Sequence, residues 1–270
     1  MSALPLRSPR VAYPPFPDRV PSATDQTDSY EVGFAQTGAD LDEIQRLRFR
    51  VFNLELHEGL DESYLTGKDV DPFDDTCHHL LVRDRRTNQI IGTYRLQTYA
   101  MAEAGIGFYS ATEYDLSGMP LAYQQGAVEI GRACIAKDHR SLQVLYLLWR
   151  GLGMYMNYNH KRYLFGCCSL TSQDPNEAKQ VMDFLHAKGH THPDMRLRPL
   201  PALQCYPDDF EAPTVRRPKV PRLMRVYLSM GATICSDPAI DRMFKTIDYL
   251  AFFDAETMDP RTSAYFQYTG

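Results

Sequence analysis

The residues that point most directly to chemistry lie in the apolar stretch 128–135, which contains Glu129 and Arg132. Burying an unpaired ion costs roughly several kcal/mol, so an acid and a base inside a predicted strand need partners. The chain offers charged candidates upstream at Arg48, Asp69, Asp71, Asp74 and Arg95. A buried carboxylate can also take up or release a proton during catalysis, so the stretch is compatible with acid–base chemistry.

The order and spacing of these residues resemble the N-acyltransferase branch of the GNAT superfamily. That branch includes acyl-homoserine-lactone synthases, long-chain N-acyl amino acid synthases and hemolysin-like ornithine lipid synthases. The resemblance covers about residues 31 to 265, and its closing part is the segment 227–232 followed by Pro238, Asp241, Phe244, Asp248 and Tyr249. Gly131 stands where homoserine-lactone synthases usually have serine, and no tryptophan follows Phe52 closely. The resemblance therefore favours the hemolysin-like branch.

The resemblance implies an α/β (α+β) fold of the GNAT type. Such a fold has a central mixed, mostly antiparallel sheet that is flanked by helices and has splayed central strands. The implied activity moves a long-chain, 3-hydroxy fatty acyl group from a phosphopantetheine thioester on acyl carrier protein. The implied acceptor is the α-amine of ornithine, glycine or a similar amino acid, and the product is an N-acyl amino acid or lyso-aminolipid.

The resemblance also assigns an amine-acceptor network, which consists of Arg48, Phe52, Asp69, Asp71, Asp74 and Arg95. Glu129 and Arg132 are the expected catalytic residues. Burial would raise the pKa of Glu129 and suit it to act as a base, whereas pairing with Arg95 or Arg132 would make it structural. Strict alternation places Glu129 and Arg132 on opposite faces, so they converge only if the strand is bulged, and a bulge fits best at Gly131.

The expected donor site is formed by the end of this strand and the segment that follows it. Backbone N–H groups of Ala133, Cys134 and Ile135 would stabilise the oxyanion, and Arg140 precedes a helix whose N-terminus would attract phosphate. The segment 140–145 contains no glycine, which disfavours the close approach to a pyrophosphate that coenzyme A requires. We expect no tightly bound cofactor, with acyl carrier protein or acyl-coenzyme A as co-substrate.

Hydrophobic periodicity predicts the elements that position these residues. Helices are expected over 41–56, 143–159 and 220–230, and a loop over 57–76 should deliver the three aspartates. Strands are expected over 79–84, 89–97, 127–135, 163–170, 233–235 and 246–253.

Prolines set the predicted domain boundaries. Residues 1–29 contain six prolines and predict a flexible arm, while residues 30–270 predict one domain. Residues 173–219 contain seven more and predict an irregular insertion, which is either a lid or a surface excursion.

Composition excludes several classes of function. The net charge of −5 argues against general nucleic-acid binding, although Arg216, Arg217, Lys219, Arg222 and Arg225 form a basic cluster. That cluster is either solvated surface or a contact for an acidic carrier protein or anionic lipid. The six cysteines lack zinc-site spacing and predict reduced core residues without a metal. The aspartates fail the calcium-loop pattern, because Asp74 falls where glycine is required.

The sequence contains no signal-peptide pattern and no transmembrane run, so we expect a cytoplasmic protein with at most peripheral contact at the inner membrane face. Two rival functions stay open. One is an acyl- or acetyl-coenzyme A transferase acting on a small amine, which would need a tighter phosphate loop. The other is a non-catalytic acyl-carrier or lipid-binding scaffold. Pore formation would require a membrane-active segment, and none is visible.

Overall fold

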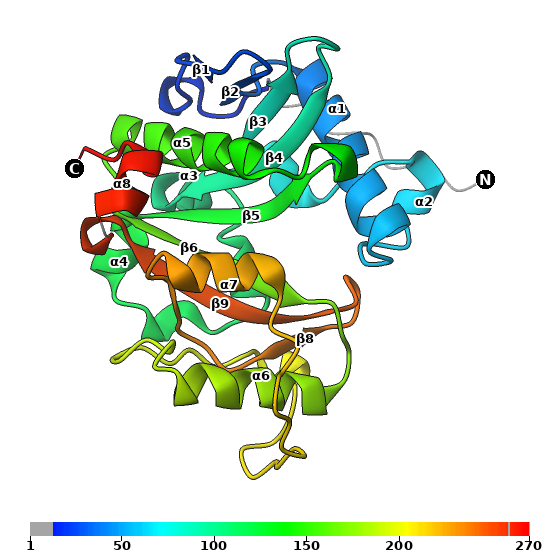
Figure 1. Ribbon diagram of the computed structural model, residues 1–270, viewed down its shortest axis with the longest axis vertical. Helices are drawn as coiled ribbons and strands as arrows, with labels where there is room; N and C mark the ends of the chain where they lie inside the picture. The colour runs from blue at the N-terminus through cyan, green and yellow to red at the C-terminus, as the bar shows by residue number, and fades with distance from the viewer. Residues whose placement is uncertain (1–12, 259, 270) are drawn as a thin grey trace.

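Nine strands form one mixed sheet in the computed structural model, which describes residues 13–258 and 260–269. The strand order is β1-β2-β3-β4-β5-β6-β9-β7, and β8 also pairs with β9 (Figure 1). Neighbouring strands are antiparallel except for β5 and β6. The strands are β1 Asp25–Gln26, β2 Tyr30–Phe34, β3 His78–Asp84, β4 Ile90–Thr98, β5 Ala127–Ile135, β6 Tyr163–Leu170, β7 Thr233–Ile234, β8 Ala239–Asp241 and β9 Thr246–Asp254.

The parallel strands β5 and β6 separate soon after they begin. They pair only where residues 127–129 face residues 163–165, although β5 continues for six residues and β6 for five beyond that point. Figure 1 shows β5 diverging from β6 and β9 across the centre of the molecule. The mixed, mostly antiparallel sheet with splayed central strands is therefore confirmed. The separation opens a wedge in the middle of the sheet.

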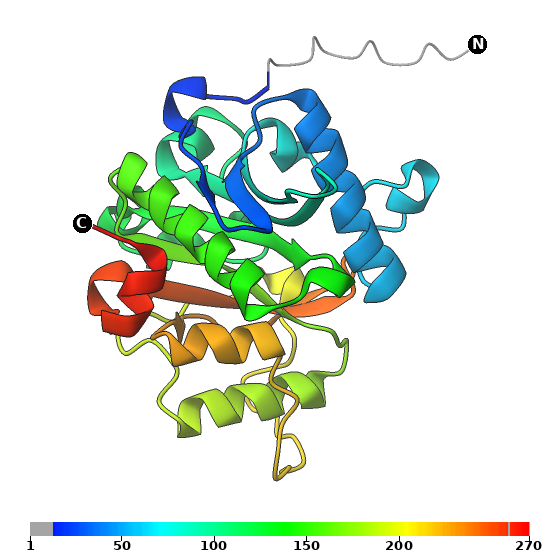
Figure 2. The same cartoon turned by 45° about the horizontal axis from the view of Figure 1, so that its top comes forward.

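Helices cover both faces of this sheet. Apolar side chains of α5, α7 and α8 share one buried cluster with Leu96, Val128 and Leu164, so these helices lie on one face. Figures 1 and 2 show α6 and α7 side by side. The α-helices of the described residues are α1 Gly38–Phe49, α2 Ser63–Thr66, α3 Tyr99–Ala104, α4 Leu121–Gly126, α5 Leu142–Tyr158, α6 Pro175–Ala187, α7 Arg222–Ser229 and α8 Pro260–Phe266.

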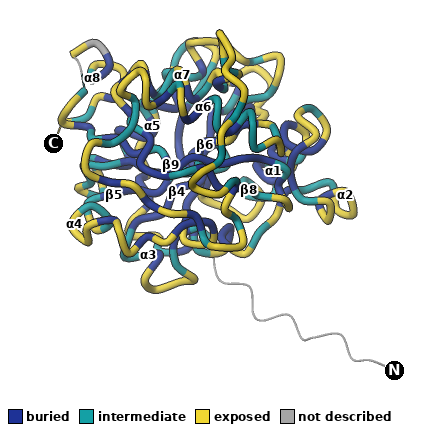
Figure 3. Tube along the Cα trace, turned by 90° about the horizontal axis from the view of Figure 1, so that it is seen from below, coloured by how far each residue is buried: buried dark blue, intermediate teal, exposed yellow. Residues whose placement is uncertain are grey.

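The helix α5 makes the crossover that a parallel strand pair requires. Ser141 caps its N-terminus by accepting a hydrogen bond from Val144 N. Gly153 allows α8 to pack closely, because a Cβ at this position would lie 1.7 Å from Phe266 O. Figure 3 shows the central strands running through the buried interior, with exposed residues concentrated at the periphery.

Several predicted elements are confirmed. Strands β5 and β6 have the predicted bounds, β3 and β9 differ from prediction by one residue at one end, and β4 and α5 are each shifted by one residue. The helix predicted over 41–56 is instead α1 followed by the π-helix Arg50–Glu55, in which Leu56 N donates to Val51 O. Short π-helices often occur at functional sites.

Two segments differ from the prediction. Residues 13–29 do not form a flexible arm but pack on the domain, since Val20 is buried and Pro15 O accepts a hydrogen bond from His78 Nε2. The remainder of the predicted arm, residues 1–12, lies outside the described residues. The insertion 173–219 is not wholly irregular, because it contains α6, a helix of 13 residues.

None of the helices in 13–258 and 260–269 combines the length and apolar composition needed to cross a bilayer.

Candidate active site

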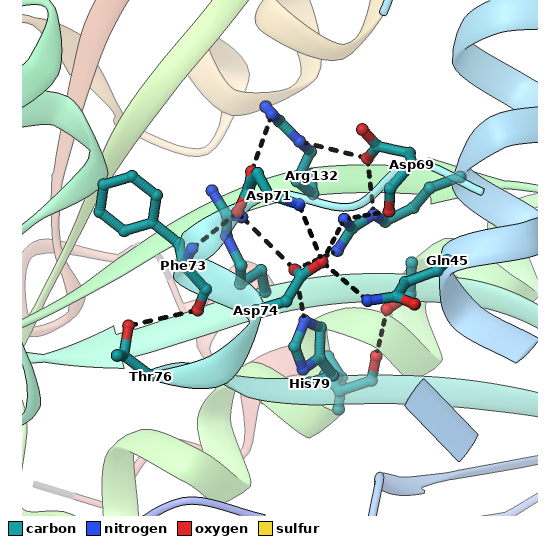
Figure 4. Close-up of polar contacts among 12 residues, drawn as sticks. Gln45, Asp69, Asp71, Phe73, Asp74, Thr76, His79 and Arg132 are labelled. Carbon is teal, nitrogen blue, oxygen red and sulfur yellow. Dashed lines mark hydrogen bonds and ion pairs between the residues drawn. The ribbon is translucent and has the colours of Figure 1, made fainter. Parts of the chain in front are cut away.

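Arg48 anchors a buried network of charges below the splayed strands. Its side chain is fully buried on α1, where Nε donates to Asp69 Oδ2 at 2.7 Å and Nη1 donates to Asp74 Oδ1 at 2.7 Å. Gln45 and His79 also contact Asp74 (Figure 4). Burial alone would raise the pKa of Asp74, but Arg48 and His79 outweigh it and hold that pKa well below its usual range.

Asp71 joins this network to two further arginines. Arg95 Nη1 lies 2.6 Å from both Asp71 carboxylate oxygens, and Arg132 Nη2 lies 3.0 Å from Asp71 Oδ2. Arg132 Nε also lies 3.3 Å from Asp69 Oδ2 (Figure 4). Three arginines thus face three aspartates, so the charges of the network balance.

The turn that delivers the aspartates is fixed by its own hydrogen bonds. Asp71 caps the 3-10 helix Pro72–Asp75 by accepting from Phe73 N, and the Asp74 carboxylate accepts a hydrogen bond from Asp71 N. This capping box orients Asp71 and Asp74 toward the arginines. The predicted loop therefore has a local reason for its shape.

A β-bulge in β5 brings Arg132 into the network. Between the pairs Thr93 with Cys134 and Arg95 with Gly131, β4 supplies one residue and β5 supplies two. Arg132 occupies the bulge with φ +50°, a left-handed conformation that is strained for a residue with a side chain. The bulge is thus one residue later than the predicted position at Gly131. It turns Arg132 to the face of Arg95 and Glu129.

Glu129 is buried on the same face and is held by the loop after α3. Its carboxylate accepts hydrogen bonds from Tyr109 N at 2.8 Å, Ser110 N at 2.7 Å and Ser110 Oγ at 2.6 Å. Burial raises the pKa of Glu129, although the bonds from Ser110 and Tyr109 oppose the shift. Among the described residues no arginine lies at ion-pair distance from Glu129, so the alternative of direct pairing is not observed.

A cavity of about 480 Å³ occupies the wedge between β5 and β6. Its charged end contains Arg95, Glu129 and Arg132. Its apolar wall comes from α5, α7 and the residue after α7, through Leu145, Leu148, Trp149, Leu152, Val226, Tyr227 and Met230. The cavity therefore suits an extended ligand that is apolar along its length and has one polar end, which would lie inside the sheet.

The predicted donor residues line this cavity as well. Ala133, Cys134 and Ile135 lie on the part of β5 that is not paired with β6. Arg140 forms two bonds to the Glu55 carboxylate and donates to Ile135 O at 3.0 Å. A donor phosphate at Arg140 would therefore compete with Glu55.

The predicted acceptor residues divide into two groups. Phe52 and Arg95 line the cavity together with the predicted catalytic residues Glu129 and Arg132, and Phe52 makes an edge contact with Phe244 at 5.4 Å between centroids. Arg48, Asp69, Asp71 and Asp74 do not line it. These four residues lie behind the wall, where the three aspartates contact Arg95 and Arg132. Their assignment to the amine-acceptor site stays a prediction.

Several polar residues of the site were missed. Gln97 lines the cavity two residues after Arg95, and regular alternation along β4 would have placed it on the same face. Tyr109, Ser110, Glu113, Cys167, Ser169 and Asp248 also gather there or directly behind the wall. Asp248 belongs to the closing segment of the resemblance but was not assigned to the site, whereas the segments of the other five carry no motif. Only the tertiary fold brings these residues together.

Comparison with known proteins places this geometry in context. Residues 47–150 match the acetyltransferase (GNAT) domain family. The chain is 33% identical over 249 residues to L-ornithine N(alpha)-acyltransferase of Brucella abortus (strain 2308), covering 88% of this chain and 89% of that protein. It is 31% identical to L-ornithine N(alpha)-acyltransferase of Agrobacterium fabrum (strain C58 / ATCC 33970), covering 87% of this chain and 84% of that protein.

Solved structures with a similar arrangement have low sequence identity. The acyl-homoserine-lactone synthase LasI aligns with 13% identity and a TM-score of 0.48, covering 88% of this chain and 93% of that one. FeeM, an N-acyl amino acid synthase from uncultured soil microbes, aligns with 11% identity and a TM-score of 0.47, covering 86% and 93%.

Proposed function

The chain belongs to the L-ornithine N(alpha)-acyltransferase family of GNAT N-acyltransferases, and from this premise we propose a specific reaction for it. It transfers a long-chain, 3-hydroxylated acyl group from the phosphopantetheine thioester of acyl carrier protein to the α-amine of L-ornithine. The observation that carries the proposal is the cavity in the β5–β6 wedge, which joins an apolar wall to Glu129 and Arg132.

The size of the cavity supports a long acyl chain. Its volume of about 480 Å³ lies in the range that holds drug-sized ligands, and an acetyl group would fill little of it. Apolar side chains of α5 and α7 form most of the wall, so a fatty acyl chain that binds there is removed from contact with water. A transferase for acetyl groups alone has no need of this space.

The cavity mouth supports a carrier protein as donor. Arg222 lines the cavity at the start of α7, and Arg216, Arg217 and Arg225 are exposed nearby in the sequence. Among the described residues none of these four arginines forms an ion pair with an acidic side chain. An acidic carrier protein would complement their charge and be guided to the mouth.

Glu129 is the proposed proton acceptor. The amine nitrogen attacks the thioester carbonyl carbon, the C–S bond breaks, and the thiolate leaves with the pantetheine arm. The proton of the attacking amine passes to Glu129, directly or through a water, and then to the thiolate. A carboxylate with a raised pKa suits this exchange. Backbone N–H groups of residues 133–135 stabilise the oxyanion.

The test is a mass-spectrometric assay of the purified protein and its Glu129→Gln variant. Each is supplied with 3-hydroxyacyl carrier protein or the matching acyl-coenzyme A, together with a mixture of amino acids. We expect N-acyl ornithine from the carrier protein and loss of product in the variant. Product from acetyl-coenzyme A alone would favour the small-amine transferase. No product from a folded protein would refute the reaction.

A further inference from the structure

A second group of charged residues lies on the sheet face of Glu129 and consists only of acids. Glu113, Asp241 and Asp248 each place a carboxylate oxygen within 4.8 Å of the others. Glu113 and Asp248 are each 3% exposed. The network of arginines and aspartates described above does not include them.

Among the residues that the structure describes, only neutral donors contact these carboxylates. Thr246 Oγ1 donates to Asp248 Oδ2 at 3.1 Å, and Cys167 Sγ donates to Glu113 Oε2 at 3.5 Å. In the part of the chain that the structure describes, Glu113 Oε1 and Asp248 Oδ1 are buried without a hydrogen-bond partner. No lysine or arginine there forms an ion pair with either residue. The carboxylates therefore lack the cation that burial of a charge requires.

The cavity reaches this acidic group. Asp248, Cys167 and Glu58 line it, and so does Gln97, whose amide oxygen and nitrogen are both buried without a partner among the described residues. Arg132 lines the same cavity and acts electrostatically on Asp248. One ligand in this cavity can thus meet the Arg132 guanidinium and the Asp248 carboxylate, and a Glu113 carboxylate oxygen lies behind Asp248, within 4.8 Å of it.

We infer that Glu113 and Asp248 bind the side-chain ammonium of the acceptor and thereby select a dibasic amino acid. This inference rests on the proposed function. An ammonium offers three N–H donors, which match the unpartnered oxygens of the two carboxylates. The α-carboxylate of the same molecule faces Arg132, and its α-amine lies between these two contacts, toward Glu129 and the β5–β6 wedge.

The test compares L-ornithine with L-norvaline, which has the same carbon chain and no side-chain amine. We expect kcat/KM of the wild type to favour ornithine by at least about 100-fold. Asp248→Asn and Glu113→Gln should each reduce that preference by tenfold or more, mainly through KM for ornithine, because charged hydrogen bonds are among the strongest. Asp183→Asn, which removes an exposed carboxylate on α6, should keep the wild-type preference.

Other outcomes would overturn the inference without touching the proposed function. These are equal use of both acceptors by the wild type, or an equal loss with both acceptors in each variant. Loss of activity with a chelator and rescue by Ca²⁺ or Mn²⁺ would assign the acids to a metal ion instead. If the wild type acylates neither acceptor, the proposed function fails. Calorimetric binding of ornithine and norvaline to wild type and Asp248→Asn then tests the inference directly.

Discussion

Arg132 Nη2 lies 3.0 Å from Asp71 Oδ2, although regular alternation along β5 would direct the Arg132 side chain to the opposite face of the sheet. The bulge at Arg132 is strained, and its ion pairs with Asp69 and Asp71 hold it in place. Asp71 contacts Arg95 in turn. The network thus sets the positions of the two arginines that reach the cavity, and Arg48 sets the positions of the aspartates.

Replacing Arg48 should unfold the network. Arg48→Met leaves Asp69 and Asp74 without their shortest cationic contacts, so we expect the free energy of unfolding to fall by roughly 3–5 kcal/mol. Urea denaturation measures the change. Arg46→Met removes an exposed ion pair with Asp42 on the same helix and should cost less than about 1 kcal/mol. Equal losses in the two variants would show that the buried network contributes nothing specific.

The sequence predicts the strands around this network well because their apolar runs are long and clearly bounded. Strand β5 was predicted at its exact bounds, and its charged pair indicated the site. The sequence favours a bulge at Gly131, because glycine adopts φ above zero most easily. The fold instead puts that conformation at Arg132, since the ion pairs that compensate the strain come from residues some 60 positions earlier.

The missed features have different causes. The helix α6 had a readable signal, with Asp174 as N-cap, Pro175 in the first turn, and apolar residues at helical spacing, namely Ala178, Val181, Met182 and Leu185. The high proline content of its surroundings hid that signal. The contact of Ser110 with Glu129 had no signal, because it depends on how a loop packs against the sheet. Local sequence does not encode such contacts.

Glu129 should affect turnover more than binding. We expect Glu129→Gln to lower kcat by about 10²- to 10⁴-fold with little change in KM for either substrate, since the amine loses its proton acceptor. Steady-state kinetics with a saturating acyl donor measures this. A variant with nearly full kcat would mean that Glu129 only anchors the loop at Tyr109 and Ser110.

Ser110→Ala provides a related test of the same role. Ser110 Oγ donates to Glu129 Oε1 at 2.6 Å, and this bond favours the charged carboxylate. Its loss should raise the pKa of Glu129 further and move the acidic limb of the pH–rate profile to higher pH. If the acidic limb does not shift in a folded variant, it does not report the titration of Glu129.

Asp248 should make stability depend on pH. Burial, reinforced by Asp241, raises the pKa of Asp248 to about 6, although Ser169, Thr246 and Arg132 oppose the shift. The folded state therefore holds a proton that the unfolded chain releases near pH 4. This contribution to stability is fully present below that pH and is lost as the pH rises through about 6.

Asp248→Asn lacks this titration. Its stability relative to the wild type should therefore increase by about 1–2 kcal/mol between pH 5 and pH 7.5. Urea denaturation at the two pH values gives the difference. Burial and the nearby Asp248 also raise the pKa values of Glu58 and Glu113, so part of the difference comes from these two residues. The same comparison in a Glu113→Gln background removes the share of Glu113. A difference that stays constant with pH would refute the assignment to Asp248.

The basic residues of α7 should affect KM for the acyl donor only when that donor is a protein. Reversing the charge in Arg222→Glu with Arg225→Glu should raise KM for the acyl carrier protein by about tenfold or more at low salt, because an acidic partner is then repelled. The effect should shrink as ionic strength rises, since screening shortens the reach of exposed charges. Arg86→Glu reverses an exposed charge in the turn between β3 and β4 and should leave this KM unchanged. If the double variant also raises KM for a free pantetheine thioester to the same extent, the arginines act on the phosphopantetheine arm and not on the surface of a carrier protein.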